Sequence, residues 1–85
     1  MTWTLLWDPV AARQVHKLDP MTQKRIIRKA VDLGLDPHPP GSRKLTGTPN
    51  LWRIREGDYR IIYAIEDDRL VVLIVKVGHR REVYR

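Results

Sequence analysis

Two strand-like runs joined by Gly57-Asp58 constrain the fold more than any other feature of this sequence. Residues 51–56 and 59–66 are rich in β-branched and aromatic side chains, which favour strands over helices. Glycine supplies the positive φ that a two-residue hairpin turn requires. We therefore expect the two runs to pair as an antiparallel hairpin closed at Gly57.

The segments on either side of this hairpin complete the second half of the chain. Residues 69–77 form a third strand-like run, and Asp67-Asp68 before it is another candidate for a two-residue turn. Residues 38–50 contain three prolines and two glycines and are expected to form a loop. The second half is thus predicted to be a loop followed by a three-stranded antiparallel meander.

The first half of the chain shows two other periodicities. In residues 2–7, the apolar residues Trp3, Leu5 and Trp7 alternate with Thr2, Thr4 and Leu6, the period-2 pattern of a half-buried strand. Asp-Pro pairs follow at positions 8–9 and 19–20, and they predict two helix starts because aspartate is a common N-cap and proline favours the first helical position. Gly34 is expected to end the second helix. The apolar stripes of these helices are Ala11, Val15 and Leu18 in the first and Ile26, Ile27, Ala30 and Val31 in the second.

The predicted element order is βααβββ, and helices that precede an antiparallel meander are typical of the α+β class. A chain of 85 residues has room for one hydrophobic core. We expect a single domain over residues 1–85, in which the two N-terminal helices pack on one face of a four-stranded, mainly antiparallel sheet.

The hairpin register separates the side chains of the sheet into two sets. A two-residue turn at Gly57 makes Arg55 face Arg60, and facing residues share one side of the sheet. Like charges in facing positions destabilise a hairpin, so a bound phosphate, whose oxygens match the guanidinium fork, is a good reason for Arg53, Arg55 and Arg60 to cluster. The opposite, core-facing set is Trp52, Ile54, Ile61, Tyr63, Ile65, Leu70, Val72 and Ile74.

Two further groups are expected beside the arginines. The last strand should end next to the Gly57 turn, so His79, Arg80, Arg81 and Tyr84 are predicted to emerge near the cluster. Farther along the same outer face, an apolar patch suggests a surface that binds a partner, unless a loop or the tail of the chain covers it. The residues of this patch are Ala64, Val71, Leu73 and Val75.

Charge narrows the class of partner. Sixteen Lys and Arg residues against ten Asp and Glu residues give a net charge of +6, which favours a polyanion, although solubility alone is the alternative explanation. Without cysteine, neither a disulfide framework nor a thiolate metal site is available. We expect no metal and no cofactor. We also expect a cytoplasmic location without membrane contact, because the sequence shows neither a membrane-spanning stretch nor a signal peptide.

Three motifs together resemble a known family. They are Lys44-Leu45-Thr46-Gly47, residues 51–63 with Gly-Asp-Tyr-Arg at 57–60, and residues 77–84 with Gly-His-Arg at 78–80 and Val-Tyr at 83–84. The combination resembles the RelE branch of the RelE/ParE superfamily, toxins of type II toxin–antitoxin systems, over nearly the whole chain. The resemblance implies an mRNA interferase, an endoribonuclease that inhibits translation by cutting mRNA in the ribosomal A site through the RNA's own 2′-hydroxyl, without metal.

The resemblance also implies roles for individual residues. The catalytic positions would be Arg60, Arg80, His79 and Tyr84. The positions that bind the RNA and its phosphates would be Arg53, Arg55, Lys44 and Arg81. Some active relatives have lysine at the positions of Arg53 and Arg55; arginine stays protonated and is a poor base. Of the two proton-transfer candidates, His79 and Tyr84, this departure therefore favours His79.

The implied partner is a cognate antitoxin, with an acidic, amphipathic segment that matches the arginines and the apolar patch; a toxin–antitoxin heterotetramer is an assembly that the resemblance allows. Two alternatives remain. One is a ParE-like toxin that inhibits DNA gyrase without catalysis, and the other is an RNA- or ribosome-binding protein that cuts nothing. The Gly78-His79-Arg80 run and Tyr84 beside the strand arginines favour the nuclease.

Overall fold

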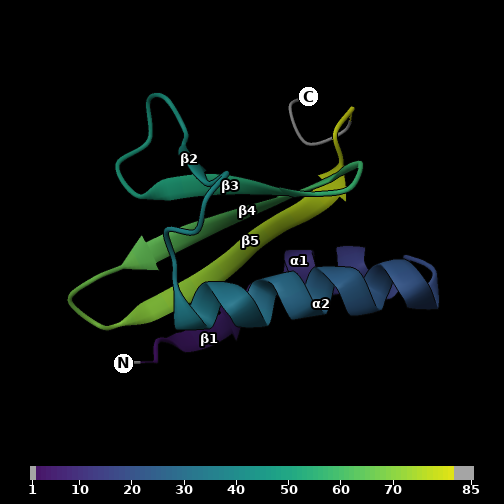
Figure 1. The fold of residues 1–85 in the computed structure, drawn as a ribbon, viewed down its shortest axis with the longest axis horizontal. Coiled ribbons are helices and arrows are strands. Elements are labelled where there is room, and N and C mark those ends of the chain that lie inside the picture. The colour runs from purple at the N-terminus through teal and green to yellow at the C-terminus, as the bar shows by residue number, and fades with distance from the viewer. Residues whose placement is uncertain (1, 82–85) are drawn as a thin grey trace.

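Two helices lie on one face of a five-stranded mixed sheet in the computed structural model, which describes residues 2–81 (Figure 1). The elements are β1 (Thr4–Trp7), α1 (Pro9–His16), α2 (Pro20–Leu35), β2 (Arg43–Lys44), β3 (Leu51–Glu56), β4 (Tyr59–Glu66) and β5 (Val71–His79). The strand order is β1-β5-β4-β3-β2, with β1 parallel to β5 and the other neighbours antiparallel. This arrangement confirms the α+β class and the order of the predicted elements.

The predicted four-stranded sheet is wrong by one strand. Residues 38–50, expected to be a loop, contain the two-residue strand β2, in which Arg43 pairs with Arg53. The backbone N–H of Leu45 extends the contact by donating to the carbonyl of Leu51 at 2.9 Å. Two residues are too few to show an alternating pattern, so only the pairing itself identifies this strand.

The first turn of the meander was predicted correctly and the second was not. Gly57 has a φ of 60°, and Arg55 faces Arg60 as expected. At the other end Glu66 pairs with Val71, so residues 67–70 form a four-residue connection in place of the expected two-residue turn. Leu70 was predicted to face the core, but it belongs to this connection, with a φ of 52° and 38% exposure.

Both helices begin at the predicted caps. The Asp8 side chain accepts a hydrogen bond from the N–H of Val10 at 2.8 Å, and Asp19 accepts one from the N–H of Thr22 at 3.1 Å. Hydrogen bonds from the Thr22 hydroxyl and N–H lower the pKa of Asp19. These contacts satisfy backbone donors at each helix start, which is what an N-cap contributes.

The core-facing stripe of α2 differs from the expected one. Ile26 and Ala30 are buried as predicted, and Leu33 completes the stripe one turn later. Ile27 and Val31, expected on the same face, are 46% and 49% exposed. The predicted stripe was too wide because α2 rests on the sheet with a narrow face, at positions i, i+4 and i+7.

Gly34 does not end α2, which continues to Leu35 and has Asp36 as its C-cap. The carbonyl of Gly34 accepts a hydrogen bond from the N–H of Trp3 at 2.8 Å. A Cβ at this position would lie 3.6 Å from the carbonyl oxygen of Trp3. Gly34 therefore marks the close approach of α2 to the residues that lead into β1.

The core lies between the helices and the helix-facing side of the sheet. Tyr63 is fully buried there, and its hydroxyl donates to the carbonyl of Pro37 at 2.9 Å, which ties the segment before β2 to the centre of the sheet. Burial raises the pKa of Tyr63 to about 12. The buried core residues are Ala11, Val15, Ile26, Ala30, Leu33, Ile54, Ile61, Tyr63, Ile65, Val72, Ile74 and Val77. Within residues 2–81, no helix is long and apolar enough to cross a membrane.

Candidate functional site: an arginine cluster on the open face of the sheet

Four arginines lie at neighbouring register positions on the side of the sheet that faces away from the helices. Arg55 faces Arg60 across β3 and β4, and Arg43 faces Arg53 across β2 and β3. We call Arg43, Arg53, Arg55 and Arg60 the arginine face. The cluster of three predicted from the hairpin register is confirmed, and β2 adds Arg43, which the sequence did not place there.

Arg60 is the buried member of the arginine face. It is only 8% exposed, and its Nε has no hydrogen-bond partner within the described part of the chain. Burying a cation without full pairing costs folding free energy, since the charge loses its water. A buried cation that faces another cation is suited to a bound anion, because the anion would neutralise both charges.

A bulge in the sheet decides what lies opposite Arg60. The β4–β5 register shifts between Ile62 and Tyr63, so that Gly78 faces Arg60 and His79 faces Tyr59. Glycine contributes no side chain at the register position opposite Arg60. The same shift places His79 on the other side of the sheet, where its ring meets that of Tyr59 edge-on, with the ring centroids 5.7 Å apart.

The end of β5 lies beside the Gly57 turn, as predicted. The N–H of Arg80 donates to the carbonyl of Asp58 at 2.8 Å, and the N–H of Arg81 donates to Nδ1 of His79 at 3.3 Å. Both arginine side chains are exposed. The remaining predicted catalytic residue, Tyr84, lies outside the described residues.

The edge of the arginine face is hollowed. Arg43, Arg53 and Arg55 line a hollow of about 300 Å³ together with residues 40–41 and Lys29 of α2. Arg53 is half-buried and Arg55 is exposed, so a ligand can reach the guanidinium of Arg55 from solvent. Lys44, which was expected to contact RNA, pairs with Trp52. Its register position is therefore on the opposite side of the sheet from that of Arg43.

The apolar patch predicted on this face is smaller than expected. Leu73 faces Ala64 and Val71 faces Glu66, but Ala64 and Val71 are only 7% and 5% exposed. Leu73 and Val75 are half-buried, and Val75 is the extra residue of the bulge. Within residues 2–81, no group of three or more His, Asp or Glu side chains is arranged to hold a metal ion.

Comparisons with known proteins find similar sequences over nearly the whole chain. The sequence model of the family described as ParE toxin of type II toxin-antitoxin system, parDE, matches residues 5–84. Toxin RelG of Mycobacterium tuberculosis is 35% identical to this chain, over 100% of the chain and 99% of RelG. The mRNA interferase toxin RelE of Escherichia coli is 31% identical, over 99% of the chain and 92% of that toxin.

The fold is shared as well. The crystal structure of the toxin-antitoxin complex RelBE2 from M. tuberculosis contains a chain that superposes with a TM-score of 0.84 at 29% identity, covering 94% of this chain and all of the other. Sequence and fold therefore lead to the same assignment: this chain is a RelE-like member of the ParE/RelE family of toxins of type II toxin–antitoxin systems.

Proposed function

We propose that this toxin is a metal-independent endoribonuclease that cuts mRNA on the ribosome, in the cytoplasm. The buried and incompletely paired guanidinium of Arg60, with Arg55 facing it, is the observation on which the proposal rests. Cations fixed in a partly desolvated position stabilise charge that develops in a transition state, at no cost in rearrangement. The E. coli relative, named as an mRNA interferase toxin, supports the same activity.

The proposed reaction uses the RNA's own 2′-hydroxyl. The 2′-oxygen forms a bond to the adjacent phosphorus, and the bond from phosphorus to the 5′-oxygen of the next nucleotide breaks. The products are a 2′,3′-cyclic phosphate and a 5′-hydroxyl. The phosphoryl oxygens gain negative charge on the way, and Arg53, Arg55 and Arg60 would bind them through charge-assisted hydrogen bonds.

One proton must leave the 2′-hydroxyl and one must reach the 5′-oxygen. Arginines stay protonated and cannot act as the base, so this step needs another group. Tyr84 and His79 remain the proposed proton-transfer residues, with Arg80 near the leaving oxygen, and Lys44 and Arg81 along the RNA. The contact of His79 with Tyr59, on the helix side of the sheet, favours Tyr84 of the two.

The proposed partner is a cognate antitoxin that covers the arginine face. Solved relatives occur as toxin–antitoxin complexes in M. tuberculosis and E. coli. Carboxylates of an acidic segment would satisfy the arginines, and aliphatic side chains would cover Leu73 and Leu6, which is 42% exposed next to it. Such a segment would order on binding, and its charge would make association faster at low salt.

Inhibition of DNA gyrase is the second candidate, because the matching family model is described by its ParE member. A toxin of that kind would not need a buried, incompletely paired arginine on an open sheet face. A supercoiling assay with purified gyrase distinguishes the two candidates, and we expect no inhibition by this protein.

The decisive experiment is translation of a reporter mRNA with ribosomes, in the presence of EDTA at a level that spares the ribosomal magnesium but removes tighter-bound transition metals. Primer extension should reveal new 5′ ends within the reading frame, and those ends should accept phosphate from polynucleotide kinase directly because they bear hydroxyls. Intact mRNA, or 5′-phosphate ends, would contradict the proposed reaction. Addition of the protein encoded beside the toxin gene should suppress the cuts.

A further inference from the structure

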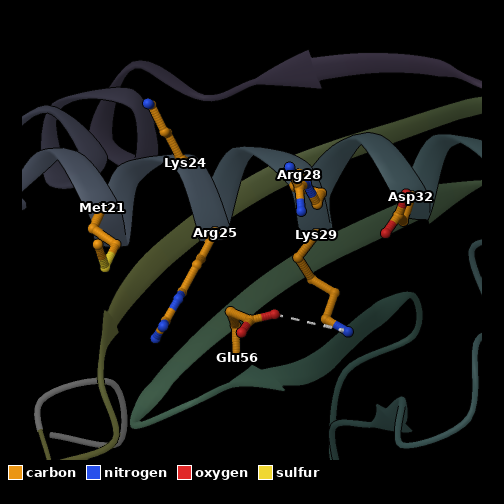
Figure 2. A pocket seen from close by; sticks show the side chains of 7 residues that line it. All are labelled: Met21, Lys24, Arg25, Arg28, Lys29, Asp32 and Glu56. Atoms are coloured by element: carbon orange, nitrogen blue, oxygen red, sulfur yellow. Dashed lines mark ion pairs between the residues drawn. The ribbon is translucent and has the colours of Figure 1, made fainter.

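A second cationic hollow lies on the helix side of the molecule, between α2 and the end of β3 (Figure 2). It has a volume of about 250 Å³. We call it the α2 groove, and its lining residues are Met21, Lys24, Arg25, Arg28, Lys29, Asp32 and Glu56. Arg25 and Lys29 extend from α2 toward the hairpin with Glu56 between them (Figure 2).

Folding accounts for only part of the positive charge in the α2 groove. Within residues 2–81, the one ion pair in the groove joins Lys29 Nζ to Glu56 Oε1 at 4.0 Å, with both side chains about 30% exposed. Lys24 and Arg28 are four residues apart, as are Arg25 and Lys29, and like charges at this spacing destabilise a helix. Asp32, four residues after Arg28, offsets part of this repulsion. Four cations against the two carboxylates of Asp32 and Glu56 still leave the groove positively charged, which attracts an anionic ligand.

The α2 groove continues into the arginine face. Lys29 lines both this groove and the hollow formed by Arg43, Arg53 and Arg55. Glu56 of the groove directly follows Arg55 in β3. The two sites thus form one cationic path around the hairpin, from the open face of the sheet to the exposed side of α2.

We infer that the α2 groove binds the sugar–phosphate backbone of RNA, outside the cleavage site. The inference rests on the proposed function, since it extends the path of the substrate. At about 250 Å³ the groove is smaller than a typical pocket that encloses a small molecule. Met21 is its one apolar lining side chain, so it lacks the apolar anchors that a protein partner would use.

The test uses the double variant Arg25→Gln/Arg28→Gln and a short single-stranded RNA whose 2′-hydroxyls are all methylated, so that no cleavage can occur. Each lost phosphate contact should lower the salt dependence of binding, the slope of log K against log salt, by about 0.7. Two contacts should lower the slope by about 1.4 and weaken binding roughly 20-fold at about 0.1 M salt. The matched control is Arg13→Gln/Arg69→Gln, which removes two exposed charges outside both hollows.

A parallel arm measures sedimentation with ribosomes. A loss of binding that is confined to the groove variant supports the inference. If the variant loses affinity for the oligonucleotide, the ligand is the messenger strand. If it loses affinity for the ribosome alone, the ligand is ribosomal RNA. Equal losses in both variants, or no loss in either, overturn it. So does a groove variant that binds RNA normally but binds poly-glutamate less well, which would indicate an acidic protein partner.

The outcome is independent of cleavage. A protein that binds RNA through the groove but cuts no mRNA contradicts the proposed function and leaves this inference standing. A protein that cuts mRNA, and whose groove variant binds RNA like the wild type, supports the proposed function and contradicts this inference. Thermal unfolding checks the fold, and we expect the groove variant to melt at or slightly above the wild-type temperature because like charges have been removed.

Discussion

The arginine face and the α2 groove both concentrate positive charge, but they hold it in different ways. In the arginine face, cross-strand pairing fixes the backbone of each residue, and Arg60 is 8% exposed. In the α2 groove, Lys24, Arg25 and Arg28 are exposed on a helix surface. Exposed charges in water interact weakly and are screened by salt, whereas partly desolvated charges interact strongly over short distances.

This difference assigns different tasks to the two regions. A fixed and buried cation can distinguish the transition state of a reaction from its ground state, because it cannot move away or be replaced by water. A flexible and exposed cation binds ground and transition states alike, so it contributes to affinity alone. Loss of charge in the arginine face should therefore reduce the cleavage rate at saturating RNA, and loss of charge in the α2 groove should reduce binding.

The largest effect is expected at Arg60. Arg60→Met replaces the guanidinium by an apolar side chain of similar length, and cleavage should fall roughly a hundredfold or more. The free energy of unfolding should stay constant or rise by about 1 kcal/mol, because a buried, incompletely paired charge is removed. Primer extension and thermal unfolding measure the two quantities. Cleavage at the wild-type rate would contradict the catalytic role of Arg60. A destabilised protein would show that Arg60 serves the fold.

The next effect concerns the support behind the arginine face. Tyr63→Phe removes the hydroxyl that binds the Pro37 carbonyl, ahead of the strand that holds Arg43. Loss of this buried hydrogen bond should cost about 1–2 kcal/mol of stability, measured by urea unfolding. An unchanged stability would mean that the segment before β2 is held by other contacts.

The same variant predicts a pH dependence. Burial raises the pKa of Tyr63 from 10 to about 12, so the folded state retains a proton that the unfolded state loses. The corresponding stability is complete below pH 10 and is lost as the pH rises through 12. The difference in stability between wild type and Tyr63→Phe should therefore shrink over this range. A constant difference would contradict the raised pKa.

A smaller effect is expected at His79. Its ring contacts Tyr59 on the helix side of the sheet, away from the side to which Arg60 belongs. His79→Gln should lower cleavage less than about tenfold. Loss of a proton-transfer group would lower it by about a hundredfold or more. The shape of the pH–rate profile should also persist. Disappearance of one limb of that profile would instead identify the imidazole as the group that transfers the proton.

The smallest effect is expected at Glu56, the carboxylate between the cations of the α2 groove. Glu56→Gln removes the partner of Lys29 and one negative charge from the proposed RNA path. RNA affinity should rise about threefold at low salt, and the gain should fade as salt rises. Cleavage at saturating RNA should not change. A change in that rate would mean that the two regions act as one site.

Features that depend on neighbouring residues could be predicted from the amino-acid sequence alone. Gly57 specifies a turn, and the turn together with side-chain alternation fixes Arg55 opposite Arg60 and Ile54 in the core. Asp8 and Asp19 begin the helices because the residues that they cap follow within three positions. These interactions are local, so the residues that make them can be recognised before the fold is known.

Features that depend on distant segments could be recognised only once the chain was folded. Arg43 joins the arginine face through a two-residue pairing, and the α2 groove exists because a helix packs beside the hairpin. The bulge at Ile62 and Tyr63 shifts the register of β5 by one residue, and a shift by one residue exchanges the two sides of a strand. That single insertion moved His79 to the helix side and left Gly78 opposite Arg60, because long-range pairing, and not local sequence, sets the register there.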